Sequence, residues 1–314
     1  MQMTLEMLYK DRFYIDKPVR LIELFCGIGA FSKALTRLGV EFETYRAIDF
    51  DKYKIQGFNA IHGANFDTTD ITELRGEDLE IVDTEKYCYV MSYSYPCQDL
   101  SMAGKRQGMA KGSGTRSGLL WEVERLLTET EHLPQVLIME NVPEVRRGIN
   151  KEHFSDWVRF LESLGYTSYA EDLNAKNYGV PQNRNRTFMV SLLDGYFTFP
   201  EPFELKERLR DRLETDVDES YFLSDAKVES IKQSTFGQRA RRIHEDTAGG
   251  GSLVHSPQEI GKNLSASHNF KPTITDGDGI SIAIDTAMGS NRHTSQYISG
   301  GVFQEQSAGA VEEV

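Results

Sequence analysis

Cys97 is the first candidate for chemistry in this sequence, because it follows a short apolar run and precedes a basic, glycine-rich stretch. A free thiol has a pKa of about 8.5, so only a small fraction is the nucleophilic thiolate at pH 7. Positive charges raise that fraction, and residues 101–118 contain no acid and four cations: Lys105, Arg106, Lys111 and Arg116. Taken alone, a cysteine beside a proline is more typical of a buried, unreactive thiol.

An acid, an amide and two arginines accompany apolar runs later in the chain. Glu140 and Asn141 come directly after residues 136–139, which are typical of a buried strand. A carboxyl group at the end of such a strand could donate a proton to a ring nitrogen. Arg184 and Arg186 are separated by one residue and precede another apolar run, so both can point to the same side of an extended chain.

A glycine turn near the N-terminus predicts a site for a nucleotide-like ligand. Gly27 and Gly29 lie between an apolar run and a stretch with helical spacing, an arrangement that presents backbone N–H groups to a ligand. Ser32 stands where a dinucleotide-binding fingerprint has its third glycine, which disfavours a nicotinamide cofactor. Asp49 follows Gly29 by 20 residues and is placed to accept hydrogen bonds from ribose hydroxyls.

A second acid, Asp70, lies at the expected end of a third strand, where its carboxylate could accept a hydrogen bond from an adenine amino group. Together with Asp49 it fits an adenosine ligand that has no pyrophosphate. Taken singly, each of these acids is more typical of a turn or a helix cap.

The elements that must position these residues alternate between strands and helices. Short apolar runs predict strands at residues 19–25, 45–48, 87–93, 136–139 and 187–193. Helical spacing occurs at residues 31–38, 119–127 and 154–164. This alternation predicts an α/β fold with a doubly wound, mostly parallel sheet. It stops near residues 199–202, so we expect one domain over 1–200 and a smaller region over 201–314, ending in a frayed acidic tail.

Composition excludes several classes of protein. The chain has 314 residues, of which 39% are hydrophobic and 26% charged, so it is globular. It has no apolar run near the roughly 18 residues needed to span a bilayer, and its charged N-terminus is unlike a signal peptide, so we expect a cytoplasmic protein. The three cysteines, Cys26, Cys88 and Cys97, lack the spacing of a disulfide framework or a zinc site, and no histidine pair suggests a metal.

The net charge of −13 is unfavourable for a protein that binds nucleic acid by bulk attraction to phosphates. Binding to nucleic acid would therefore depend on local clusters of positive charge. Two basic stretches without acids occur, at residues 101–118 and 231–243. Isolated clusters of this kind are commonly solvated surface loops.

Four blocks, taken in order and with their spacing, resemble the C5-cytosine DNA methyltransferases. They are Phe25-Cys26-Gly27-Ile28-Gly29, Tyr95-Pro96-Cys97-Gln98, Glu140-Asn141-Val142 and Gln182-x-Arg184-x-Arg186. The resemblance extends from about Leu21 to Ser191. It implies a Rossmann-like domain that binds S-adenosyl-L-methionine, releases S-adenosyl-L-homocysteine and uses no metal, followed by a target-recognition region.

The resemblance also implies roles for individual residues. Cys97 would add to C6 of a cytosine flipped out of duplex DNA, and Glu140 would bind N3 and the exocyclic amine. Arg186, and with it Arg184, would orient the base and the acid. The cofactor pocket would be lined by Phe25, Gly27, Gly29, Asp49, Phe50, Asp70, Ile71, Pro96 and Leu119. Asp49 replaces the glutamate that is more usual in the family.

DNA and the target base would be contacted by polar and basic residues. In the first 200 residues these are Gln98, Ser101, Lys105, Arg106, Arg116, Asn141 and Gln182. In the later region they are Arg239, Arg241 and Arg242. The stretch 101–118 is similar to the mobile catalytic loop of the family.

The sequence departs from the family after residue 200, where neither an Arg-x-Leu-Thr-x-x-Glu block nor a Gly-Asn-small-Val block occurs. Residues 125–131 spell the first pattern, but on the predicted helix before Glu140, so we interpret this as coincidence. Three explanations stay open: a second polypeptide that supplies the missing blocks, a truncated enzyme, or a divergent target-recognition region.

The resemblance favours a DNA (cytosine-5-)-methyltransferase of a restriction-modification system or a phage, acting in the cytoplasm and on the nucleoid. An RNA cytosine-5 methyltransferase is an alternative, because the sheet and the nucleophile do not specify the polymer. A non-catalytic nucleic-acid-binding decoy is another, motivated by the missing blocks.

Overall fold

The computed structural model describes residues 13–97, 109–112 and 116–208, four single positions beyond them and three short strands near the C-terminus. The chain forms two compact units. The first comprises Met1–Leu173 and Arg186–Pro200, and the second comprises Asn174–Asn185 and Glu201–Val314. One boundary follows Pro200, but the grouping of 174–185 with the second unit is a feature that the sequence pattern did not predict. That the units are a catalytic domain and a target-recognition region stays a prediction.

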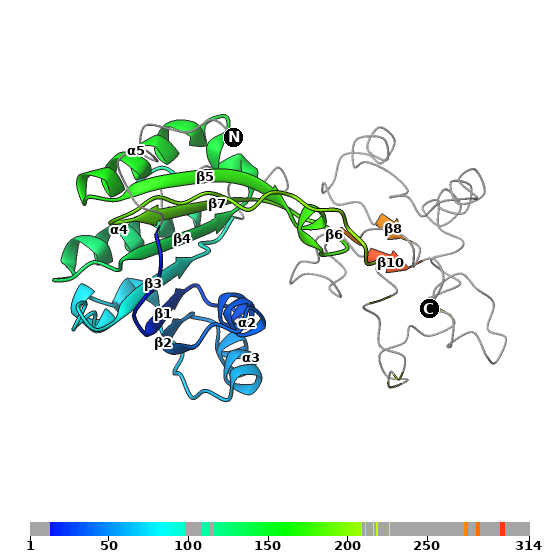
Figure 1. Cartoon of the computed structure of the whole chain (residues 1–314), viewed down its shortest axis with the longest axis horizontal. Helices are drawn as coiled ribbons and strands as arrows, with labels where there is room; N and C mark the ends of the chain where they lie inside the picture. The colour runs from blue at the N-terminus through cyan, green and yellow to red at the C-terminus, as the bar shows by residue number, and fades with distance from the viewer. Residues whose placement is uncertain are drawn as a thin grey trace. The chain divides into compact units, whose positions relative to one another are not determined.

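The first unit is built on a six-stranded sheet with the order β2-β1-β3-β4-β7-β5 (Figure 1). Its strands are β1 (Val19–Leu24), β2 (Phe42–Ile48), β3 (Cys88–Tyr93), β4 (Val136–Asn141), β5 (Thr167–Asn174) and β7 (Asn185–Leu192). β1 pairs in parallel with β2 and β3, β3 pairs in parallel with β4, and β7 is antiparallel to β4. The α/β class and the mostly parallel sheet are therefore confirmed.

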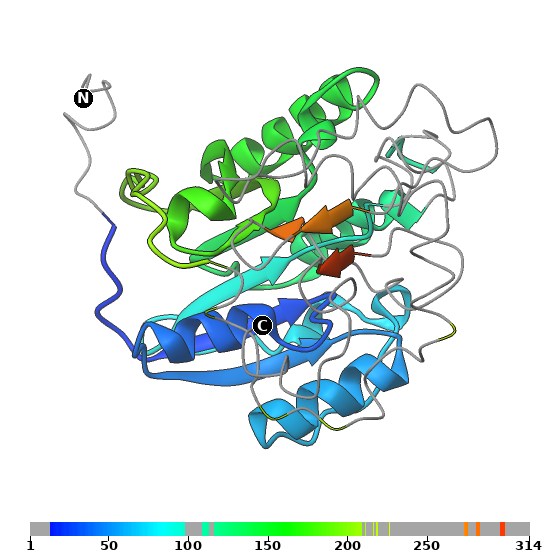
Figure 2. The ribbon, with the colours of Figure 1, turned by 90° about the vertical axis from the view of Figure 1, so that its right-hand side faces the viewer.

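Helices cover both faces of this sheet (Figures 1 and 2). They are α2 (Ala30–Arg37), α3 (Lys52–His62), α4 (Leu120–Glu129) and α5 (Asn150–Ser163). On one face, Val123 of α4 and Trp157 of α5 pack with Ile22 of β1 in the main core. On the other face, Phe31 of α2 packs against a cluster that contains Leu21 of β1. Neighbouring residues of one strand thus serve opposite layers, as the two-residue repeat of a strand requires.

Short 3-10 helices connect these elements. In the first unit they are η1 (Ile71–Glu73), η2 (Gly76–Leu79), η3 (Arg116–Leu119) and η4 (Pro143–Arg146). The expected strand ending at Asp70 is wrong, because Asp70 caps η1 and the third strand is β3. The strand β5 and the helix α3 were not predicted. Asp51 begins α3 by accepting hydrogen bonds from the backbone N–H groups of Tyr53 and Lys54, a local cap that overrides a weakly periodic pattern.

The second unit contains short pieces of structure. They are η5 (Ala175–Tyr178), β6 (Gln182–Asn183), β8 (Thr273–Thr275), β9 (Ser281–Ile282) and β10 (Gln296–Ile298). β6 pairs with β9, and β8 pairs with β10. Within the described part of the chain, no helix is both long enough and apolar enough to cross a membrane.

The strand order reverses direction between β1 and β3. The chain leaves β1 towards β2 on one side and leaves β3 towards β4 on the other. In such sheets, ligands bind beyond the carboxyl ends of the strands where the order reverses. The glycine turn follows β1 and Cys97 follows β3, so the two predicted ends of the site emerge from neighbouring strands.

Candidate active site

The glycine turn after β1 has an unusual backbone. Phe25, Gly27 and Gly29 have φ angles of 57°, 58° and 83°, all in the left-handed region. A β-carbon on Gly29 would lie 2.2 Å from Nε2 of His62, so this position also needs the small side chain. A bulky residue such as Phe25 rarely adopts a positive φ, and proteins retain such strain mainly at binding and catalytic sites.

Glu23 of β1 occupies the N-terminus of α2. Its side chain is 1% exposed, and Oε1 accepts a hydrogen bond from the backbone N–H of Ser32 at 3.0 Å and another from the Ser32 hydroxyl. Burial raises the pKa of the Glu23 carboxyl, against the opposing effect of these bonds. A carboxylate of the protein therefore takes the place at the helix N-terminus that a pyrophosphate would need. This fits an adenosine ligand without a pyrophosphate.

The sequence pattern did not assign a role to Glu23. The signal that could have found it is an acid inside the apolar run of β1, because acids are almost never fully buried unless they have a partner.

Asp49 lies beside the glycine turn, as predicted. It is 5% exposed, and its Oδ2 accepts a hydrogen bond from the N–H of Gly27 at 3.1 Å and lies 3.3 Å from Nζ of Lys54. Its backbone carbonyl accepts a bond of 3.0 Å from the N–H of Thr69. Its Oδ1 accepts a bond of 3.0 Å from the N–H of Asp51, and a contact of this carboxylate with ribose stays a prediction. The bond from Thr69 also brings the residue before Asp70 next to the end of β2.

Further residues of the predicted pocket differ in exposure. Phe50 is 63% exposed, which leaves an aromatic face for stacking, whereas Ile71 is 4% exposed and belongs to the core. The carbonyl of Pro96 accepts a hydrogen bond of 2.9 Å from the hydroxyl of Ser117. Ser117 precedes Leu119, which packs against the main core. The Pro96 and Leu119 segments are therefore joined, through a serine that the sequence pattern did not single out.

Cys97 differs from the other two cysteines in its accessibility. Cys26 and Cys88 are buried, and desolvation raises the pKa of their thiols to about 12 and about 11. At neutral pH both are protonated and poorly nucleophilic. Cys97 is partly exposed and follows Tyr93, the last residue of β3, by four positions. Accessibility thus singles out Cys97 among the three.

Asn141 joins the ends of β3 and β4. It is 2% exposed, its Nδ2 donates to the carbonyl of Tyr95 at 3.1 Å, and its Oδ1 accepts from the N–H of Val142 at 2.8 Å. Tyr95 is itself buried and precedes Cys97 by two residues. Asn141 therefore holds the backbone that leads to Cys97, while a contact of its side chain with DNA stays a prediction.

Glu140 and Arg186 form an ion pair at the same edge of the sheet. Nε of Arg186 lies 3.0 Å from Oε1 of Glu140, and the two side chains are 20% and 19% exposed. The antiparallel register of β7 against β4 pairs Glu140 with Phe188, which brings Arg186 next to the end of β4. The structure thus brings together the two residues that the sequence placed far apart, in a setting that orients the carboxyl group.

The remaining predicted residues cannot be added to this cluster from the geometry. Gln182 and Arg184 belong to the second unit, in which the backbone carbonyl of Arg184 accepts a bond of 2.9 Å from the N–H of Ala175. Arg116 begins η3, but its side chain lies outside the described part. The other residues predicted to contact DNA also lie outside it: Gln98, Ser101, Lys105, Arg106, Arg239, Arg241 and Arg242.

No group of three or more His, Cys, Asp or Glu side chains in the described ranges is arranged to hold a metal ion.

Comparison with known proteins concerns the family and the fold. A family model described as C-5 cytosine-specific DNA methylase matches residues 19–299. The chain is 37% identical over 221 residues to the orphan methyltransferase M.SssI of Spiroplasma monobiae, covering 67% of this chain and 57% of the relative. It is 42% identical over 155 residues to the type II methyltransferase M2.ScrFI of Lactococcus lactis subsp. cremoris, covering 48% of this chain and 42% of the relative. The chain thus spans about half the length of these two relatives.

A solved structure has the same fold. The Dnmt2 methyltransferase of S. pombe superposes with a TM-score of 0.59 at 19% identity, covering 90% of this chain and 74% of that protein.

Proposed function

The chain belongs to the family of C-5 cytosine-specific DNA methylases, and from this premise we propose that it transfers a methyl group from S-adenosylmethionine to C5 of a cytosine in duplex DNA. The observation that carries the proposal is the group of side chains beyond β3 and β4. Cys97 is the accessible cysteine there, and Glu140 is held by Arg186 at 3.0 Å. A nucleophile and an oriented acid at one edge of the sheet are what addition to a pyrimidine ring requires.

In this proposal Cys97 acts first. Its thiolate adds to C6 of the cytosine, and the electron pair of the C5–C6 double bond shifts to C5, where it is shared with C4 and N3. C5 thereby becomes nucleophilic. When bound, S-adenosylmethionine supplies an electrophilic methyl group. After methylation, loss of the C5 proton and expulsion of the Cys97 thiolate restore the double bond.

Glu140 stabilises the charge that develops on the ring during addition, by binding N3 and the exocyclic amine. Arg186 keeps the carboxyl group in place, so that it needs no reorientation when the base arrives. The ion pair with Arg186 is compatible with a contact to the base, because a carboxyl group has about four acceptor positions.

Residues near β1 and β2 would hold the cofactor. Gly27 and Gly29 allow the backbone to approach it closely, Asp49 would bind the ribose, Asp70 the adenine amino group, and Phe50 would stack on the ring. The Glu23 carboxylate at the N-terminus of α2 supports this ligand over a dinucleotide.

We further propose a biological role in DNA modification, either beside a restriction enzyme or in a phage. The names of the relatives, a type II and an orphan methyltransferase, support this. A second polypeptide that carries the blocks absent after residue 200 stays a prediction.

Covalent trapping tests the proposal. The chain alone is incubated with S-adenosylmethionine and a mixed-sequence pool of duplex DNA that contains 5-fluorocytosine, whose fluorine blocks the final elimination. We expect a complex that resists denaturant with the native sequence and with Cys88→Ala, a matched change at a buried cysteine. Cys97→Ser should give none.

The outcomes separate the alternatives. A complex that survives in Cys97→Ser would overturn the assigned nucleophile. A folded chain that traps structured RNA and not DNA would replace DNA by RNA as substrate. No complex from a folded chain would overturn the proposal that this chain methylates cytosine by itself.

A further inference from the structure

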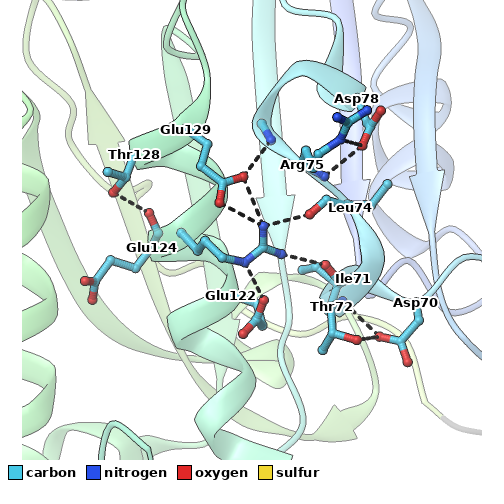
Figure 3. A network of polar contacts seen from close by, with 12 residues as sticks. Asp70, Ile71, Thr72, Leu74, Arg75, Asp78, Glu122, Glu124, Thr128 and Glu129 are labelled. Atoms are coloured by element: carbon cyan, nitrogen blue, oxygen red, sulfur yellow. Dashed lines mark hydrogen bonds and ion pairs between the residues drawn. The ribbon is translucent and has the colours of Figure 1, made fainter.

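Arg125 of α4 is the centre of a polar network that the proposed chemistry does not use. Figure 3 labels its partners Ile71, Leu74, Glu122 and Glu129. Its Nη1 donates to the carbonyl of Leu74 at 2.7 Å, and its Nη2 donates to the carbonyl of Ile71 at 3.1 Å. Two acids of the same helix hold the guanidinium, Glu122 through Nε at 2.8 Å and Glu129 through Nη1 at 3.0 Å. One side chain therefore fastens both ends of η1 to α4.

Glu129 adds a second attachment to the same segment. Its Oε2 accepts a hydrogen bond of 3.0 Å from the backbone N–H of Gly76. The two backbones approach closely there, because a β-carbon on Gly76 would lie 2.3 Å from the backbone nitrogen of Thr130. Residues 71–76 are thus held against the C-terminal end of α4 by side-chain bonds to three backbone groups.

This segment begins next to Asp70, the predicted acceptor for the adenine amino group. Oδ1 of Asp70 accepts bonds of 2.9 Å from the N–H and the hydroxyl of Thr72, which fix its side chain to η1. On the other side, Thr69 donates to the carbonyl of Asp49. The position of the Asp70 carboxyl therefore depends on η1, and the position of η1 depends on Arg125.

The same helix also meets the segment of the nucleophile. α4 follows η3, whose Ser117 donates to the carbonyl of Pro96, the residue before Cys97. Its N-terminal end is thus joined to the segment of Cys97, and its C-terminal end is joined to the segment of Asp70.

We propose that Arg125 is a positioning residue of the cofactor site, which sets the Asp70–Ile71 segment at the distance from Cys97 that the reaction needs. The inference rests on the proposed function. Arginine suits the role because its planar group carries five donors in a fixed arrangement, so it can bind two carbonyls and two carboxylates at once. A lysine has three donors at one point and cannot span them.

The test compares Arg125→Gln and Arg125→Lys with a matched control, Arg159→Gln. Arg159 lies on α5 in an exposed ion pair with Asp156, with no bond to a loop among its described contacts. Binding of S-adenosylhomocysteine is measured by calorimetry, and hydrogen exchange is followed by mass spectrometry without any ligand.

We expect Arg125→Gln to weaken binding roughly ten-fold, the loss that corresponds to one charge-assisted hydrogen bond. Arg125→Lys should recover part of it, and Arg159→Gln should bind normally. Exchange should accelerate in peptides covering residues 70–79 and stay unchanged in β1 and β3. In a double-mutant cycle with Asp70→Ala, the two effects on binding should be less than additive, because Arg125 acts through Asp70.

Two binding results would overturn the inference. One is that Arg125→Gln binds S-adenosylhomocysteine as tightly as the native chain. The other is that its effect on binding adds fully to that of Asp70→Ala. Faster exchange throughout the first unit would instead indicate a general role in stability. If the native chain itself does not bind S-adenosylhomocysteine, the proposed function fails and the inference with it, whereas native binding without an effect of Arg125 overturns the inference alone.

Discussion

Asn141→Ala is expected to damage both the stability and the reactivity of the protein. The change removes the bonds of 3.1 Å to the carbonyl of Tyr95 and of 2.8 Å to the N–H of Val142. Because these bonds are buried, each backbone group loses a partner that water does not replace. At about 1–3 kcal/mol for each unsatisfied group, we expect a loss of about 3 kcal/mol in the free energy of unfolding. For a unit of this size that lowers the melting temperature by about 6–12 °C.

The effect on reactivity follows from the position of Tyr95. Its carbonyl lies two residues before Cys97, so releasing it would let the proposed nucleophile move away from the cytosine. A displacement of about 1 Å can reduce a rate about a hundred-fold. Covalent trapping is measured at a temperature where Asn141→Ala is fully folded. Its rate should fall by roughly ten- to a hundred-fold.

Asn59→Ala is the matched control. Asn59 makes the same pair of bonds, from Nδ2 to the carbonyl of Phe66 and from the N–H of Phe66 to Oδ1, both at 2.9 Å. It lies on α3, away from β3 and β4, and it should lose about 1–2 kcal/mol of stability but trap DNA at the native rate with saturating cofactor. The reasoning would be refuted if Asn141→Ala trapped at the native rate, or if Asn59→Ala were slowed as strongly.

Three further predictions follow from single contacts. Arg186→Lys should reduce methyl transfer about a hundred-fold in a tritium-transfer assay, because an ammonium group cannot hold Glu140 as Nε does; an unchanged rate would contradict this role. Burial raises the pKa of Glu23 above 4.5, so the folded state binds this proton more tightly and the free energy of unfolding falls as pH rises through the raised pKa. Glu23→Gln should lack this dependence in urea melts taken from pH 4.5 upwards, and an identical slope would refute it. Gly29→Ala should abolish S-adenosylhomocysteine binding, whereas Gly39→Ala, with φ 69° and no atom within 4 Å of an added β-carbon, should lose only about 1–2 kcal/mol of stability; equal binding by the two variants would contradict the close packing at Gly29.

Much of the sheet could be predicted from the sequence, because its strands are buried on both faces and appear as short apolar runs. β3, in which all six residues are buried, is the clearest case. β5 was missed because its residues are half-buried or exposed and carry no apolar period. The strand predicted to end at Asp70 was wrong because an acid after threonines suits a helix cap as well as a strand end. The local pattern does not distinguish these two, and Asp70 caps η1.

The residue types needed for the proposed chemistry can be recognised in short stretches of the sequence. Cys97, Glu140, the glycine turn and Asp49 were predicted as site residues from residue type, spacing and the family resemblance, because a nucleophile, an acid and a turn each need particular side chains at the end of a strand. Their mutual placement came from the fold. Only the antiparallel register of β7 brings Arg186 to Glu140.

Supporting roles depended on tertiary structure alone. The bonds that Glu23, Asn141 and Arg125 make to backbone groups leave no pattern in the sequence, even where the residue type stands out, since every residue has such backbone groups. The sequence by itself therefore indicated the groups that we propose to react, while the tertiary structure decided which residues hold them in place, because backbone partners are chosen by proximity and not by residue type.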